Sequence, residues 1–299
     1  MFDGLWRKYR DSNIASRFIF INVAVFVLSL FIAVFCILFN SPSTAVYLMS
    51  LFELPASVET LLGHPWTPLT YMFLHAGPFH ILWNMLALYV FGKIFINFYS
   101  VRHFMGIYFW GGLFGALFFV AAYNIFPYFA PMVDETSLVG ASAAVLAIVV
   151  AAAVRAPDYR INLLFIGSVR LATFALVTVL ISFLLIAGDN AGGSFAHLGG
   201  AFAGWLFGWL VCRGADAASW VLKPYDWLCA LSSVGKGRKK KKKGNFSYTK
   251  SNRNSDYEYN ARKRNDEAEI DRLLEKIKKG GYSSLSDEEK KRLFDASSK

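Results

Sequence analysis

Six long apolar segments, separated by polar loops, constrain the fold of this chain more than any other feature. A predominantly apolar run of about 20 residues can cross a bilayer as an α-helix. The whole sequence is 55% hydrophobic and 17% charged, which is typical of a protein that crosses the membrane several times. We therefore predict an all-α membrane protein with six transmembrane helices. The predicted spans are residues 18–39, 69–97, 104–123, 138–154, 171–187 and 194–212.

The charged residues predict how these spans are oriented. Arg7, Lys8, Arg10 and Arg17 precede the first span, and Arg or Lys recurs in every second loop. The other loops carry Glu and Asp but essentially no basic residue. Because basic loops stay in the cytoplasm, both termini are expected there, which requires an even number of spans. The net charge of +10 is thus explained by topology, and no nucleic-acid partner is expected.

The remainder of the chain predicts three further regions around the membrane domain of residues 18–213. Residues 1–17 form a cytoplasmic N-terminus. Residues 214–258 form a linker in which Trp220, Tyr225 and Trp227 anchor at the membrane interface. The basic run Lys239–Lys243 either contacts anionic lipid headgroups or only reinforces the topology, and the sequence favours neither reading.

Residues 259–299 predict a small cytoplasmic helical hairpin. Ile270, Leu273, Leu274 and Ile277 recur with helical spacing, and Gly280-Gly281 should end that helix. Ser286 followed by Glu289 has the pattern of a capping box at the start of a second helix.

Polar residues recur at one depth in three of the predicted spans. His75, His80 and Asn84 lie in the outer half of the second span, and His80 and Asn84 are one helical turn apart. Ser142 and His197 lie near the outer ends of the fourth and sixth spans. A lone serine or histidine there is usually structural, but polar groups inside a membrane are costly and tend to face the bundle interior or a water-filled cavity.

A row of glycines predicts how Ser142 meets His197. Gly200, Gly204 and Gly208 recur every fourth residue below His197, a spacing that lets two helix backbones approach closely. The Ala-rich span 138–154 is the expected partner. A histidine beside a serine can remove the hydroxyl proton and create a competent nucleophile. No Asp or Glu lies at this depth, so we predict a Ser142/His197 dyad, with an oxyanion site formed by His80, Asn84 and the Ser142 amide.

These residues belong to four short motifs that follow one another along the chain. The motifs are Trp66, His75-Ala-Gly-Pro-Phe-His80-Ile-Leu-Trp-Asn84, Gly140-Ala-Ser142 and Ala196-His197-Leu-Gly-Gly200-Ala-Phe-Ala-Gly204. Over residues 18–213 this pattern resembles the rhomboid family of intramembrane serine proteases. The tail resembles a helical domain appended to some bacterial rhomboids. The chain departs from the commonest pattern at Thr67, Ala143 and Leu146, where relatives often carry Arg, Gly and an aromatic residue.

The resemblance implies the function and the roles of the site residues. It implies Ser142 as nucleophile, His197 as general base, and His80 and Asn84 as oxyanion donors, with His75, Gly140, Gly200 and Gly204 in support. It further implies transmembrane protein substrates, a cavity open to the outer side, contact with the lipid bilayer of a bacterial inner membrane, and no cofactor or metal. One alternative is an inactive relative that binds transmembrane clients. A channel or transporter is a third hypothesis, but the repeats and interrupted helices expected of one are missing from the sequence.

Overall fold

The computed structural model describes residues 12–163, 167–234, 272–273, 275–278 and 285–290. The chain divides into two compact units between residues 235 and 236, and each unit is described by itself. Several predictions fall outside the described residues: the basic N-terminus, the Lys239–Lys243 run, Ile270, Leu274 and the Gly280-Gly281 helix end.

The first unit is mostly helical, with four long apolar helices, two shorter apolar helices and several short elements between them. Its helices are α2 (Ile14–Leu38), α3 (Pro42–Ser50), α4 (Val58–Gly63), α5 (Thr67–Thr70), α6 (Pro78–Ile96), α7 (Val101–Ile125), α8 (Ser142–Arg155), α9 (Leu171–Leu184), α10 (Ala191–Cys212) and α11 (Ser219–Val234). Three 3₁₀ helices are η1 (Tyr71–Phe73), η2 (Pro127–Met132) and η3 (Leu185–Ala187), and the strands are β1 (Leu54–Pro55), β2 (Ser137–Leu138), β3 (Arg160–Leu163) and β4 (Gly167–Arg170).

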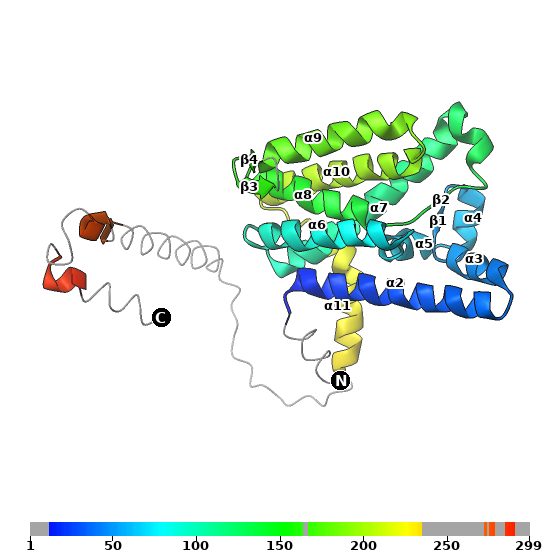
Figure 1. Ribbon diagram of the computed structural model, residues 1–299, viewed down its shortest axis with the longest axis horizontal. Helices are drawn as coiled ribbons and strands as arrows, with labels where there is room; N and C mark the ends of the chain where they lie inside the picture. The colour runs from blue at the N-terminus through cyan, green and yellow to red at the C-terminus, as the bar shows by residue number, and fades with distance from the viewer. Residues whose placement is uncertain (1–11, 164–166, 235–271, 274, 279–284, 291–299) are drawn as a thin grey trace. The chain divides into compact units, whose positions relative to one another are not determined.

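Helix α8 lies at the centre of the bundle. It packs against α6, α7, α9 and α10, while α2 packs on α6 at one edge and α9 lies at the other (Figure 1). Ten of the 14 residues of α8 are buried, and most of these are alanines. Small side chains allow neighbouring helices to surround one helix closely. In contrast, α2 buries only four of its 25 residues and exposes a broad apolar surface, as expected for contact with lipid.

Each predicted span overlaps one of these six apolar helices, and the second and fourth spans begin later than expected. Within the described residues, α2, α6, α7 and α10 are long and apolar enough to cross a bilayer, whereas α8 and α9 are shorter. The second span begins at Pro78 and not near Leu69, because proline occupies the first turn of α6 and cannot continue a helix from preceding residues. The fourth begins at Ser142, whereas we expected this span to begin at Leu138.

The segment between α2 and α6 is tied down by hydrogen bonds from three side chains. Trp66 Nε1 donates to the Leu51 carbonyl at 2.7 Å, and Thr70 Oγ1 donates to the Phe52 carbonyl at 2.7 Å. Thr67 is fully buried and donates to the His64 carbonyl at 2.9 Å, so the Thr67 departure leaves this segment hydrogen-bonded. β1 then pairs with β2, setting Leu54 opposite Leu138 just ahead of α8.

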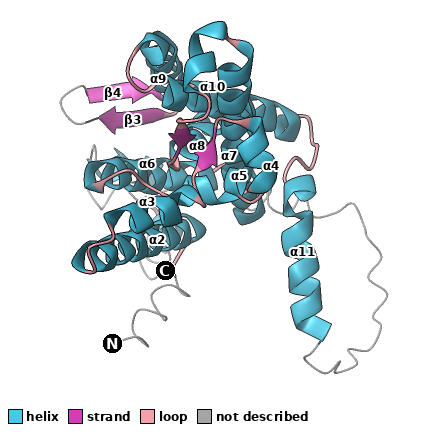
Figure 2. Cartoon of the chain, turned by 90° about the vertical axis from the view of Figure 1, so that its right-hand side faces the viewer, coloured by secondary structure: helices cyan, strands magenta, loops and turns pink. Residues whose placement is uncertain are grey.

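Two strand pairs and the helices α3, α4 and α11 were not predicted from the sequence. Besides β1–β2, the loop between α8 and α9 forms an antiparallel hairpin of β3 and β4, visible beside α9 in Figure 2. Residues around the predicted aromatic anchor form α11, whose Trp220 ring lies 5.2 Å from that of Trp110 on α7. Asp226 of α11 accepts two hydrogen bonds from Arg102, at 2.7 and 3.0 Å.

The second unit supports the predicted capping box. Residues 272–273, 275–278 and 287–290 are helical, and Leu273 and Leu285 are buried. Ser286 Oγ accepts from the Glu289 amide at 3.3 Å, while the Glu289 carboxylate accepts from the Ser286 amide at 2.8 Å. This reciprocal pair is the geometry that the Ser286/Glu289 spacing predicted.

Candidate active site

Ser142 stands at the first position of α8, directly after a stretch of non-helical backbone. Gly140 has a φ of +133°, a conformation that side chains rarely adopt, and its amide donates to the Tyr71 carbonyl at 3.0 Å. Helical hydrogen bonding starts only with the Val145 amide and the Ala141 carbonyl, and no side chain caps the helix at Ala141. The amides of the first turn, Ser142 included, therefore have no partner within α8, and the positive end of the helix dipole lies at the serine hydroxyl.

The glycine row on α10 brings the second helix against α8, as predicted. A Cβ atom at Gly200 would overlap the Ala143 carbonyl, and one at Gly204 would overlap the Ala147 carbonyl. At Gly208 it would meet the Val154 side chain at 3.0 Å. The two helix backbones are thus in direct contact along the row. This contact holds the outer turns of α8 and α10 at the separation that a serine and a histidine can bridge.

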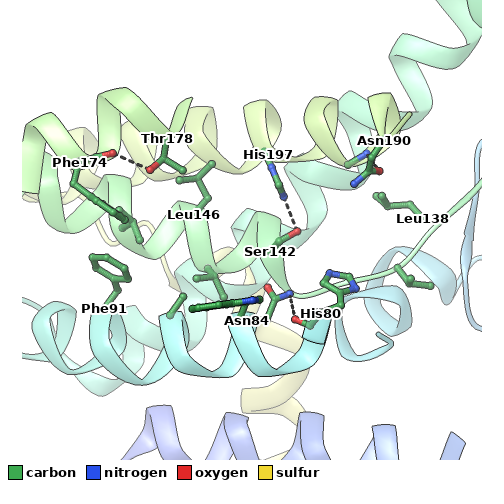
Figure 3. Close-up of a pocket in the computed structure, with 16 residues that line it drawn as sticks. His80, Asn84, Phe91, Leu138, Ser142, Leu146, Phe174, Thr178, Asn190 and His197 are labelled. Atoms are coloured by element: carbon green, nitrogen blue, oxygen red, sulfur yellow. Dashed lines mark hydrogen bonds between the residues drawn. The ribbon is translucent and has the colours of Figure 1, made fainter. Parts of the chain in front are cut away.

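His197 extends from α10 to Ser142. Its Nε2 lies 2.8 Å from Ser142 Oγ, a distance typical of a strong hydrogen bond (Figure 3). Its other ring nitrogen, Nδ1, lies 3.2 Å from the hydroxyl of Ser182 on α9. The histidine ring is therefore held at both nitrogens, by two serines on two different helices.

His80 faces the same point from α6. Its Nδ1 accepts from the Ala76 amide at 3.3 Å, and because an amide can only donate, a neutral His80 carries its proton on Nε2. A Cβ atom built on Gly140 would lie 3.0 Å from that Nε2 and 3.7 Å from Ser142 Oγ. A side chain at Gly140 would crowd both groups, so the glycine leaves the space in front of the serine open.

Asn84 lies one turn further along α6 and lines the same cavity. Its Nδ2 donates to the His80 carbonyl at 2.9 Å, which fixes the amide and leaves the second N–H available (Figure 3). His75 occupies a different position: it lies in the turn before α6, is 9% exposed, and packs edge-on against His80 with ring centroids 5.2 Å apart. His75 therefore contacts the back of His80 and does not reach Ser142.

A cavity of about 450 Å³ opens beside these residues. Near Ser142 it is polar, but it continues along the face of α8 that carries Val145, Leu146 and Val149. Its inner end is formed by Phe91 and Phe174, whose rings stack 4.9 Å apart. The cavity is therefore polar at the serine and apolar beyond it.

Sequence reasoning missed two residues of this site, Ser182 and Tyr71. Ser182 could have been noticed because Thr178 and Ser182 are one turn apart in an otherwise apolar span. Tyr71 is fully buried, donates from its hydroxyl to the Gly112 carbonyl at 2.7 Å and accepts from Gly140 through its own carbonyl. Nothing in the sequence pattern around Tyr71 indicates that it supports the backbone before Ser142.

Comparison with known families identifies the class of protein. The model of the rhomboid domain matches residues 62–214, just over half of the chain, and the protein belongs to the rhomboid family. With its apolar helices it is an integral membrane protein. Residues 253–299 match a second model, a family of unknown function designated DUF6576. No curated protein matches the chain.

Proposed function

We propose that this protein is an intramembrane serine endopeptidase that cleaves transmembrane protein substrates. The single observation that carries the proposal is the 2.8 Å separation between Ser142 Oγ and His197 Nε2 at the mouth of the cavity. A serine hydroxyl needs an adjacent base to act as a nucleophile, and a neutral imidazole nitrogen at this distance provides one. A protein that only binds transmembrane clients has no need of this pair.

The reaction follows the usual order of acyl transfer. His197 Nε2 takes the hydroxyl proton as Ser142 Oγ bonds to the carbonyl carbon of the substrate. The bond to the amine then breaks, and His197 returns the proton to the leaving nitrogen. Water, deprotonated by the same nitrogen, then attacks the acyl carbon, and His197 returns that proton to Ser142 Oγ as the ester bond breaks.

Three donors surround the position where the oxyanion would form. His80 contributes its Nε2–H, Asn84 the free hydrogen of Nδ2, and Ser142 its own amide at the start of α8. Donors fixed in advance stabilise the charge that develops in the transition state without needing to reorganise. We assign these three groups to the oxyanion site and His75 to the support of His80.

We also propose the orientation of the protein in the membrane. Arg102 lies at the start of α7, Arg155 at the end of α8, Arg170 at the start of α9 and Arg213 after α10. In helices that alternate in direction, these positions fall on one side of the bilayer. Basic residues are retained in the cytoplasm, so both termini are assigned there and the site opens toward the outer side.

The test is covalent labelling by a fluorophosphonate probe, combined with cleavage of a transmembrane test substrate. Wild-type protein in membranes should be labelled and should cleave, whereas Ser142→Ala and His197→Ala should lose nearly all of both activities because the two residues act as one unit. Each variant should keep the melting temperature of a folded protein. Cleavage by purified Ser142→Ala at the native level would disprove the proposal. Absence of labelling in folded wild-type protein would instead favour the client-binding alternative.

A further inference from the structure

We infer that Ser182 is a positioning residue that fixes which ring nitrogen of His197 carries the proton. The inference rests on the proposed function, since it concerns the base of that reaction. Its starting point is the contact between Ser182 Oγ and His197 Nδ1 at 3.2 Å, on the opposite side of the ring from Ser142.

The direction of this hydrogen bond follows from the number of protons available. Ser182 Oγ lies 2.9 Å from the Thr178 carbonyl, which can only accept. A hydroxyl has one proton, and here it goes to that carbonyl. The contact to His197 can then be a hydrogen bond only if Nδ1 donates its proton to the Ser182 oxygen.

The proton on Nδ1 decides what the opposite ring nitrogen, Nε2, can do. In a neutral imidazole one nitrogen carries the proton and the other has the free lone pair. With the proton on Nδ1, the lone pair of Nε2 points at Ser142 Oγ, which is the arrangement that a general base requires. With the proton on Nε2, His197 would donate to the serine and could not activate it. Ser182 thus performs the orienting task that a carboxylate performs in a serine protease triad.

The surroundings of Ser182 agree with a specific role. Helix α9 buries three residues, Leu171, Ala175 and Ser182, and Ser182 is the only polar one among them at 4% exposed. Its other side exposes large apolar residues such as Leu180, Ile181 and Phe183. Leu146, on α8 beside the cavity, has no group that could hydrogen-bond the histidine. The Ser182 hydroxyl donates to the Thr178 carbonyl, so its oxygen remains free to accept a hydrogen bond from His197.

Helix α9 then has two roles at this site. Besides forming a wall of the cavity through Phe174 and Thr178, α9 holds the ring of the base. The helix must be docked against α10 for the Ser182–His197 hydrogen bond to exist, so the position of α9 and the proton on His197 are linked.

The experiment compares Ser182→Ala with a matched serine in another apolar helix. Ser29 on α2 donates only to the carbonyl of Phe26, at 2.8 Å, and Ser29→Ala removes an equivalent hydroxyl far from the site. The loss of one neutral hydrogen bond should lower kcat by about tenfold in Ser182→Ala. KM should be unchanged, because Ser182 orients the base and does not touch the substrate. Ser29→Ala should keep the native kcat.

Nitrogen NMR of ¹⁵N-histidine-labelled protein reports which ring nitrogen of His197 carries the proton. This would not change in Ser182→Ala if Ser182 had only a structural role. His197 is assigned by the signal missing in His197→Gln. Wild-type protein should show His197 protonated on Nδ1, and Ser182→Ala should show a mixture of the two tautomers. A wild-type His197 protonated on Nε2 overturns the inference even if Ser182→Ala does not fold, and so does a native kcat in Ser182→Ala. Ser142→Ala serves as the reference. If Ser142→Ala cleaves at the native rate, the proposed function fails. If Ser142→Ala is inactive but Ser182→Ala is as active as Ser29→Ala, only the inference about Ser182 fails.

Discussion

Gly200 packs directly against the carbonyl of Ala143, the residue that follows Ser142. Since Gly200 lies about one turn after His197, this backbone contact fixes the distance between the two helices at the depth of the Ser142–His197 hydrogen bond. The glycines of α10 therefore set the Ser142–His197 distance as well as the packing of the two helices.

The contact at Gly204 predicts that Gly204→Leu lowers activity far more than stability. Overpacking a tight interface costs about 1–3 kcal/mol, whereas misplacing a catalytic group by about 1 Å can cost 10²-fold in rate. Gly204→Ala should be milder in both respects. Activity and melting temperature are measured on purified protein, with Gly63→Ala as the control, because a Cβ atom at Gly63 meets nothing within 4 Å. Native activity in Gly204→Leu would show that this contact does not set the dyad geometry.

The oxyanion donors predict a second set of variants. His80→Ala and Asn84→Ala should each slow turnover by about 10²–10³, the cost of removing one donor in a serine protease. Fluorophosphonate labelling should persist at a reduced rate because Ser142 and His197 remain. The measurement is kcat beside the labelling rate, and an unchanged kcat in both variants would remove these residues from the site.

The ion pair between Arg102 and Asp226 predicts a pH-dependent contribution to stability. Two hydrogen bonds from the Arg102 guanidinium hold the pKa of Asp226 below its usual value. A depressed carboxylate pKa stabilises the folded state fully above the unfolded pKa of about 4, and this contribution disappears as the pH falls through the folded value.

Asp226→Asn should accordingly lower the melting temperature slightly at pH 7, by about 1–2 °C because the pair is partly exposed to solvent. The gap should narrow as the pH falls below about 4, the unfolded pKa of an aspartate. Asp134→Asn, a change at an exposed carboxylate, should show little difference at either pH. A gap of equal size at pH 3 would mean that the charge of Asp226 does not contribute.

The division into two units predicts that the tail is dispensable for catalysis. Deletion of residues 244–299 should leave cleavage in detergent intact, because every residue of the proposed site lies in the first unit. Ser142→Ala in the shortened chain provides the background rate. Complete loss of cleavage in a folded truncation would show that the tail takes part in the reaction.

Hydropathy predicted where along the chain the apolar helices lie, because it reports burial in lipid. It did not predict where α6 and α8 begin, since hydropathy does not distinguish a helix from extended backbone that is hydrogen-bonded inside the protein. Residues 138–141 carry no charged or polar side chain, yet they are not helical: Leu138 pairs with β1, and the Gly140 amide donates to the Tyr71 carbonyl. Pro78 was the signal that could have corrected the start of α6.

The candidate site was predictable where its residues share a helix or a spacing. His80 and Asn84 are one turn apart, and the glycine row selects α8 as the partner of α10. Ser182 was not predictable in the same way, because its contact depends on the rotation of α9 against α10. Several positions of an apolar span could carry a hydroxyl, and only tertiary packing decides which of them meets His197.

The short length of α8 determines how deep Ser142 lies in the bilayer. Its 14 residues extend about 21 Å, whereas the hydrocarbon core of a bilayer is about 30 Å thick. If Arg155 marks one boundary of that core, Ser142 lies about 9 Å below the other. In a thicker or thinner bilayer, the distance between Ser142 and this second boundary would change, while the position of Ser142 relative to His197 would stay the same.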